Sequence, residues 1–216
     1  MVKRAAISWS GGKDSLAALS ASRGGLDVVA ALTMFDEAGA RSRSHGLRPE
    51  LVAAQTASLG LRAVSARCSW ATYDESFTAA LRTLARDGIT HVVFGDLVYP
   101  EHLAWAEARC AAAGIVAVEP LFGRPTSELF DAFVASGATA LMVTVREPWL
   151  DESWLGRPLS ADMKSSFVER GIDPCGERGE YHTAVVDGPG FAYPIRVTEG
   201  ERVRHGACLA IDLIPC

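Results

Sequence analysis

The sequence lacks the composition of several broad protein classes. Its 21 lysine and arginine residues are outnumbered by 26 aspartate and glutamate residues, which gives a net charge of −5. General nucleic-acid-binding proteins usually carry a basic excess instead. The sequence also has no apolar run of membrane-spanning length and no secretory pattern at its amino-terminus. We therefore expect a cytoplasmic protein that binds neither membranes nor nucleic acids in general.

Metal-binding and disulfide patterns are missing as well. The five cysteines are odd in number and scattered, with no C-x-x-C pair, and the five histidines show no H-x-x-x-H or H-E-x-x-H spacing. These spacings are the usual signatures of structural zinc sites and of zinc enzymes. We expect a protein of a reducing compartment without structural zinc.

What the sequence does have is an alternation of strand-like and helix-like segments through its first two-thirds. The expected strands are 5–9, 27–34, 61–65, 91–94 and 115–118. The expected helices are 13–23, 49–59, 74–86 and 100–113. Such alternation predicts a Rossmann-like parallel sheet of five strands with helices on both faces. Near Arg124 the character changes, so we expect one domain over 1–124 and a smaller α+β domain over 125–216.

The segment between the first strand and the first helix has the composition of a phosphate-binding loop. It reads Ser8-Trp9-Ser10-Gly11-Gly12-Lys13-Asp14-Ser15. The first N–H groups of a helix lack intrahelical partners and attract anions, and glycines let the backbone approach a phosphate closely. The spacing is neither that of a Walker loop nor that of a dinucleotide fingerprint. An ordinary capped helix start is the structural alternative.

Residues at the ends of three strands are expected to share one crevice. In parallel sheets of this type, ligands bind outside the carboxyl ends of the strands. The loop after the first strand, Thr33 and Met34 in the second, and Gly95 and Asp96 after the fourth all lie at such ends. For Met34, simple core packing is the alternative.

A second group of polar residues lies near the carboxyl-terminus. Glycines flank Glu177 and Glu180 in the segment 175–183, and we expect this turn to present both carboxylates rather than bury them. Asp187 follows a short apolar strand and enters a Gly-Pro turn. Carboxylates at one cleft suit Mg²⁺, ammonia or a cationic substrate. A pair of polar surface turns explains the same pattern equally well.

Together these motifs resemble a known family. The pattern S-G-G-x-D-S after the first strand resembles the PP-loop ATP pyrophosphatases. The segments L-D-E-S-W-L-G-R at 150–157, G-E-x-G-E-Y-x-T at 176–183 and V-x-D-x-P at 185–189 are similar to the diphthine–ammonia ligases within that superfamily. The resemblance implies a ligase that adenylates a carboxylate with ATP, releases pyrophosphate and transfers ammonia. The carboxylate is protein-bound diphthine or a small molecule.

The resemblance also implies roles for individual residues. The expected catalytic residues are Asp14, Glu177, Glu180 and Asp187. The residues expected to bind ATP are Ser8, Trp9, Ser10, Gly11, Gly12, Lys13, Ser15, Thr33, Met34, His45, Gly95 and Asp96. Mg²⁺ is expected to reach Asp14 together with ATP. We expect no nucleophilic role for Cys175, because no base lies near it in the sequence.

Two other functions remain open at the sequence level. One is a different PP-loop ATP pyrophosphatase reaction on a small molecule or RNA, although thiolation usually needs a reactive cysteine pair or a metal cluster. The other is a non-catalytic adenine-nucleotide sensor. The oligomeric state is also open, with a homodimer among the options. Trp149 and Trp154, which we expect to be exposed, suit an interface or a substrate lid.

Overall fold

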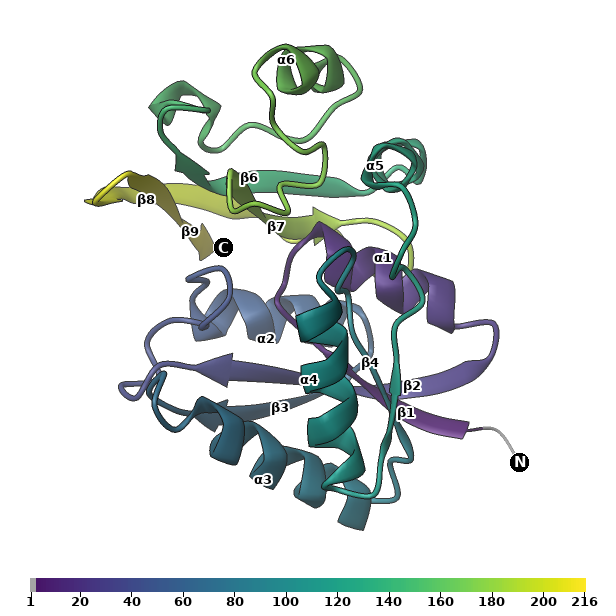
Figure 1. Cartoon of the computed structure of the whole chain (residues 1–216). Helices are drawn as coiled ribbons and strands as arrows, with labels where there is room; N and C mark the ends of the chain where they lie inside the picture. Colours follow the sequence, from purple (N-terminus) through teal and green to yellow (C-terminus); the bar gives the residue numbers. More distant parts are fainter. Residues whose placement is uncertain (1–2) are drawn as a thin grey trace.

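The molecule contains two β-sheets, and two of its helices, α1 (Lys13–Ser22) and α2 (Pro49–Ser58), lie between them (Figure 1). The structure is a computed structural model, and it describes residues 3–216. The first sheet is wholly parallel and has the strand order β3-β2-β1-β4-β5. Its strands are β1 (Lys3–Ser8), β2 (Leu26–Phe35), β3 (Arg62–Arg67), β4 (His91–Val93) and β5 (Val116–Val118).

Helices connect the parallel strands and cover both faces of this sheet. They are α1 (Lys13–Ser22), α2 (Pro49–Ser58), α3 (Tyr73–Arg86) and α4 (Pro100–Ala111). The central strands are apolar on both faces, as a doubly covered parallel sheet requires. The strand order reverses direction between β1 and β4, so a crevice opens between the loops that follow these two strands.

The second sheet is antiparallel, with the order β7-β6-β9-β8. Its strands are β6 (Thr139–Arg146), β7 (Tyr181–Asp187), β8 (Val197–His205) and β9 (Cys208–Pro215). The helix α5 (Thr126–Ala135) precedes β6, while the short helices η1 (Glu152–Trp154) and α6 (Met163–Glu169) lie between β6 and β7. β7 is an edge strand, and its outer edge faces the loop between β1 and α1: the Val185 amide donates to the Gly11 carbonyl at 2.8 Å.

One hydrophobic cluster joins the two sheets. α1 and α2 lie between them (Figure 1), where side chains such as Leu19 and Leu51 pack in the same cluster as Val185 and Leu213. A second cluster lies between the first sheet and the helices α3 and α4, around Phe77 and Leu81. The shared cluster fixes the second sheet against the helices that flank the crevice.

The predicted fold class is confirmed. The five parallel strands, their helices and the smaller α+β part are all present, with element ends within two residues of those expected. The domain boundary near Arg124 stays a prediction. Within residues 3–216, no helix is both long and apolar enough to cross a membrane.

Candidate functional site

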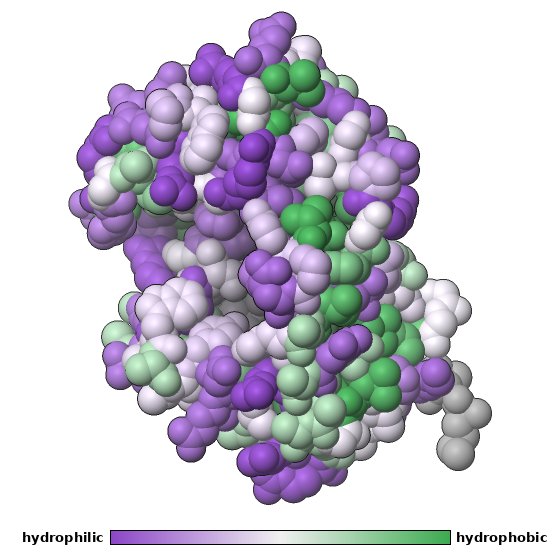
Figure 2. Space-filling model, viewed as in Figure 1, coloured by the Kyte–Doolittle hydropathy of each residue, from purple (hydrophilic) through white to green (hydrophobic). Residues whose placement is uncertain are grey.

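A cavity of about 660 Å³ lies at the carboxyl ends of the first sheet's strands and reaches the turn before β7. The surface is hollowed between the two halves of the molecule, on the side toward which β2 points (Figure 2). The loop after β1, the loops after β2, β3 and β4, and the segment 175–183 all contribute to its lining. The cavity has the size of an ordinary small-molecule site.

Backbone geometry makes the two glycines of the first loop necessary. Gly11 has a φ of 81°, in the left-handed region where a side chain is strained, and an added Cβ would lie 2.5 Å from the Leu47 side chain. A Cβ on Gly12 would collide with the His45 ring. Gly12 is the N-cap of α1, and it therefore offers no capping side chain.

Serine hydroxyls order the rest of the loop. The Ser15 hydroxyl donates to the Gly12 carbonyl at 2.9 Å, and the Ser10 hydroxyl contacts Ser15 Oγ at 3.3 Å. The Gly12 amide in turn donates to Ser10 Oγ at 3.3 Å. Ser8, Ser10 and Ser15 all line the cavity, as expected for a loop that binds an anion.

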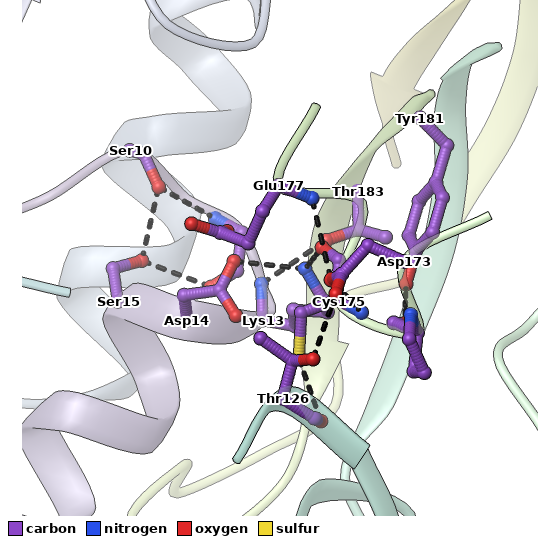
Figure 3. A network of polar contacts seen from close by, with 12 residues as sticks. Ser10, Lys13, Asp14, Ser15, Thr126, Asp173, Cys175, Glu177, Tyr181 and Thr183 are labelled. Atoms are coloured by element: carbon purple, nitrogen blue, oxygen red, sulfur yellow. Dashed lines mark hydrogen bonds and ion pairs between the residues drawn. The ribbon is translucent and has the colours of Figure 1, made fainter. Parts of the chain in front are cut away.

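Lys13 points inward and joins the loop to the second half of the chain (Figure 3). Its ammonium forms an ion pair with Asp14 at 2.8 Å, donates to the Cys175 carbonyl and lies 5.1 Å from the centre of the Tyr181 ring. Burial, the largest effect, would lower the pKa of Lys13, but Asp14 together with Tyr181 and Cys175 outweighs it and the pKa is raised. Lys13 is therefore a charged residue within the site rather than a solvent-exposed one.

Three carboxylates from separate elements line the same cavity. Asp14 comes from α1, Asp96 from the loop after β4, and Glu177 from the turn before β7. Burial and the neighbouring Asp14 raise the pKa of Glu177 to about 7. Burial also raises the pKa of Asp96, against the opposing effect of His102, whose Nδ1 lies 3.5 Å from the carboxylate. Glu177 is thus poised to exchange a proton near neutral pH.

Another acid, Glu119, directly follows β5; it was not predicted, and it is not among the residues that line the cavity. Both of its carboxylate oxygens are buried, and neither has a hydrogen-bond partner among residues 3–216. Burial raises its pKa to about 7, and the charge of Asp96 adds to that effect. Its place directly after a strand of the parallel sheet was the signal that the sequence offered.

The expected exposure of Glu180 is wrong. Its side chain is 0% exposed, and its carboxylate accepts hydrogen bonds from the amides of Asp173 and Arg178, both at 2.9 Å. The Arg178 guanidinium adds an ion pair at 3.2 Å. The turn closes around Glu180 and presents Glu177 instead, because two backbone amides converge on one carboxylate of the pair.

Asp187 does not lie in the cavity. It ends β7, whereas the cavity is lined by Tyr181, His182 and Thr183 at the other end of that strand, so that even Thr183 is about 13 Å away at the usual rise per residue. Its carboxylate accepts a hydrogen bond from the amide of Gly188 at 2.8 Å, so it orders the following turn. Asp187 was expected directly after the strand; it is the last residue of β7, at the end of the strand that lies away from the cavity.

Five expected nucleotide-binding residues are not among those that line the cavity: Trp9, Gly11, Gly12, Thr33 and Met34. Trp9 is buried, and its indole N–H donates to Gln55 at 3.0 Å. The Thr33 hydroxyl donates to the Trp9 carbonyl at 2.8 Å, and the Met34 carbonyl accepts from the Arg43 amide at 2.8 Å. Gly95 and Asp96, by contrast, do line the cavity.

His45 lines the cavity as expected and pairs with a second histidine. Its Nδ1 lies 2.7 Å from the Thr183 carbonyl, and its ring stacks on His182 with the centroids 4.8 Å apart. Because a carbonyl only accepts, this contact assigns the proton of neutral His45 to Nδ1 and leaves a lone pair on Nε2. Burial lowers the pKa of His45 to about 4 and that of His182 to about 3, so both rings are neutral at pH 7.

An aromatic group on the opposite wall was not predicted. Trp70, Tyr73 and Trp105 line the cavity, and Trp70 is 69% exposed. The Trp70 ring stacks on Tyr73, and the Arg43 guanidinium lies 4.9 Å from its centre. Trp70 and Tyr73 follow β3, so the rule that ligands bind at strand ends would have found these two. Such rings suit a planar or cationic group of a ligand.

Two further expectations concern single residues outside the loop. Cys175 is buried, its thiol donates to the Thr126 carbonyl, and burial raises its pKa to about 12, which makes a nucleophilic role unfavourable. Trp154 is not exposed as expected: it is buried against Phe167. Trp149 is half-buried.

The fold of the first sheet and the loop after β1 together indicate a class of protein. A doubly covered parallel sheet with S-G-G-x-D-S after its first strand is the architecture of PP-loop proteins. The diphthamide synthase N-terminal domain model matches residues 3–117, and the corresponding C-terminal domain model matches residues 126–213. The chain belongs to the diphthamide synthase family.

Several relatives share parts of this sequence. A diphthine–ammonia ligase of Schizosaccharomyces pombe is 31% identical over 45% of this chain and 17% of its own length. The enzyme of the same name from Rattus norvegicus is 26% identical over 67% of this chain and 55% of its own length. The chain thus spans at most about half the length of these curated relatives.

A solved structure titled as a predicted subunit of tRNA methyltransferase from Methanocaldococcus jannaschii is also similar. It covers 86% of this chain and 98% of its own, at a TM-score of 0.45 and 15% identity.

Proposed function

We propose that the protein is an ATP-dependent, AMP-forming ligase that joins a carboxylate to ammonia. The observation that carries the proposal is the single cavity shared by the phosphate-type loop and the acidic turn of residues 175–183. A loop of this kind alone suits any nucleotide-binding protein. A carboxylate with a pKa near neutrality beside it, as at Glu177, suits chemistry that must remove protons.

ATP would bind with its phosphates at the loop. The amides and hydroxyls around Ser10, Gly11, Gly12 and Ser15 supply donors, and the N-terminus of α1 supplies partial positive charge. The substrate carboxylate would attack the α-phosphorus, forming a bond to it as the bond to the leaving pyrophosphate breaks. The products of this step are an acyl-adenylate and pyrophosphate.

The carboxylates fit a magnesium ion that arrives with the nucleotide. Within residues 3–216, no three or more acidic, histidine or cysteine side chains are arranged to hold a metal by themselves. Mg²⁺ commonly takes one or two protein carboxylates and completes its shell with phosphates and water. Asp14 and Asp96 offer these oxygens, and the bound ion would neutralise phosphate charge.

Ammonia would then attack the acyl carbon and displace AMP. The new C–N bond forms as the bond to the AMP oxygen breaks, and the nitrogen must lose a proton. We assign that proton to the carboxylate of Glu177. Ammonium would be drawn to the acidic side of the cavity, and its first proton would pass to solvent water before ammonia attacks. Protein-bound diphthine is the carboxylate that the names of the relatives suggest, and a small molecule is the other candidate.

Nucleotide product analysis tests the proposal. Purified protein would be incubated with Mg-ATP and ammonium chloride, with and without fractions of a cell extract, and nucleotides would be separated and quantified. We expect AMP and pyrophosphate in equal amounts, dependent on ammonium and on one fraction. Asp14→Ala should abolish AMP formation, whereas Asp131→Ala, on the exposed face of α5, should not.

Other products would select another function. ADP in every fraction would indicate a phosphohydrolase, and bound, uncleaved ATP would indicate a nucleotide sensor. AMP formation that ignores ammonium would indicate a different ATP pyrophosphatase reaction, including one on RNA. Each of these results would contradict the proposed ligase function.

A further inference from the structure

We propose that Thr183, a residue of the second sheet, completes the phosphate site. In this proposal its hydroxyl accepts a hydrogen bond from the Lys13 amide and donates its own hydrogen to a phosphate oxygen of the nucleotide. The inference rests on the proposed ATP binding and adds a specific residue to it, from a part of the chain 170 residues away from the loop.

The hydroxyl of Thr183 lies at the N-terminus of α1. Thr183 is 1% exposed, its Oγ1 is 3.1 Å from the Lys13 amide, and the residue lines the cavity (Figure 3). The first amides of a helix are usually capped by a side chain of the preceding residue. Here that residue is Gly12, which has no side chain and whose position leaves no room for one beside His45. Thr183, from another element, instead accepts from the first of the unpaired amides, that of Lys13.

The hydrogen bond with the Lys13 amide leaves the donor hydrogen of the Thr183 hydroxyl unused. A threonine hydroxyl has two acceptor lone pairs and one donor hydrogen, and Lys13 occupies a lone pair. Among residues 3–216, no group accepts the remaining hydrogen. A buried donor without an acceptor is costly, and at a helix N-terminus that faces a cavity the natural acceptor is an anion.

β7 is held so that this side chain keeps its direction. The Thr183 carbonyl accepts from His45 Nδ1 at 2.7 Å, and the Val185 amide donates to the Gly11 carbonyl at 2.8 Å. Gln55 then bridges the carbonyls of Gly11 and Val185 with its amide group, at 3.0 and 2.8 Å. The outer edge of β7 is therefore held at Thr183 by His45 and at Val185 by Gly11 and Gln55, and such fixed positions are what a preorganised anion site needs.

Binding measurements on the full chain test the role of Thr183. Thr183→Val keeps the shape and loses the hydroxyl, Thr183→Ser keeps the hydroxyl, and Thr78→Val removes a buried hydroxyl in α3 that only contacts its own helix. Affinities for Mg-ATP and for adenosine, which lacks phosphates, would be measured by calorimetry. We expect Thr183→Val to bind Mg-ATP ~10- to 100-fold more weakly, with unchanged adenosine affinity. Thr183→Ser and Thr78→Val should match the wild type.

The outcomes separate this inference from the proposed function. Equal Mg-ATP affinity in Thr183→Val and wild type would show that the residue only caps the helix and would overturn the inference alone. A wild-type protein that does not bind Mg-ATP would overturn both. If Thr183→Val does not fold, Thr183→Cys fills the same space with a weak donor, and an unchanged affinity in that variant would equally contradict the inference.

Discussion

At the scale of single residues, two glutamates in one turn have opposite environments. Glu177 and Glu180 are three residues apart and both stand next to glycine. Two backbone amides and an arginine enclose Glu180, whereas the Glu177 carboxylate lies at the cavity. The buried residue therefore stabilises the turn, and the other is available for chemistry.

Replacing Glu177 by glutamine should remove the proton acceptor and little else. We expect Glu177→Gln to bind Mg-ATP normally and to form the amide product ~10²- to 10⁴-fold more slowly. The base form of Glu177 exists above its pKa of about 7, so wild-type amide formation should rise with pH through that value. The variant should lack this rise when rates are compared at equal concentrations of free ammonia, because free ammonia itself increases with pH. Equal amide formation by both proteins across the pH range would exclude Glu177 as the base.

Replacing Glu180 should instead destabilise the fold. Glu180→Ala leaves the amides of Asp173 and Arg178 without their acceptor in a buried turn, at a cost of about 1–3 kcal/mol for each. Urea unfolding would measure the loss. Glu201→Ala, on an exposed strand, is the control and should change the free energy of unfolding by less than about 0.5 kcal/mol. A full-stability Glu180→Ala protein that cannot form product would restore a catalytic role.

At the scale of elements, the edge strand β7 and the loop after β1 satisfy each other's backbone hydrogen bonds. β7 has a free edge that would otherwise expose unpaired backbone groups. The loop after β1 covers that edge through the Val185–Gly11 bond, and Gln55 from α2 stands between them at 0% exposure. The loop after β1 thus depends on β7 and α2, two elements from outside its own strand and helix.

Gln55 should therefore control both stability and the shape of the loop. Gln55→Leu keeps the volume but removes its hydrogen bonds to Trp9, Gly11 and Val185, leaving buried polar groups without partners at about 1–3 kcal/mol each. We expect a lower free energy of unfolding and weaker Mg-ATP binding. Thr56→Val, the next residue of α2, removes only bonds to its own helix and should do neither. Unchanged affinity in Gln55→Leu would mean that the loop holds its shape alone.

At the scale of the whole molecule, ion pairs reinforce the junction of the two sheets. Asp212 of β9 accepts from Arg41 and from Arg48, which lie before α2. Burial opposes the shift, but the two guanidinium groups lower the pKa of Asp212 to about 2. A group with a lowered pKa stabilises the fold above its unfolded pKa of about 3.9, and this contribution is lost as the pH falls toward 2.

Asp212→Asn should lower the free energy of unfolding, because it weakens the ion pairs with Arg41 and Arg48. With both arginines partly exposed, screening reduces the contribution, and we expect a loss of about 1–2 kcal/mol at pH 7. The difference from wild type should shrink as the pH falls from 4 to 2, because the wild-type carboxylate is then protonated too. Urea unfolding at pH 7, 4 and 2.5 would measure it. A difference that stays constant with pH would show that the charge contributes nothing.

The sequence by itself determined the alternation of elements, the parallel sheet and the loop after β1. These follow from local patterns: apolar runs, glycines at helix ends, and Gly11 and Gly12 where the backbone needs them. The positions of Gly95 and Asp96 at the cavity followed as well, because strand order brings the carboxyl ends of parallel strands together, and His45 was expected there from the family resemblance. Glu177 was also identified from its place in a glycine-flanked turn.

Only the tertiary structure decided how the second sheet meets the loop. No local pattern tells which of two glutamates two amides will enclose, which end of β7 Asp187 will occupy relative to the cavity, or that Trp9 and Thr33 will bond inward. These depend on contacts between residues far apart in the chain, such as Thr183 with Lys13. The composition of the loop after β1 identifies it in the sequence, but the packing of the second sheet determines which groups form hydrogen bonds with it.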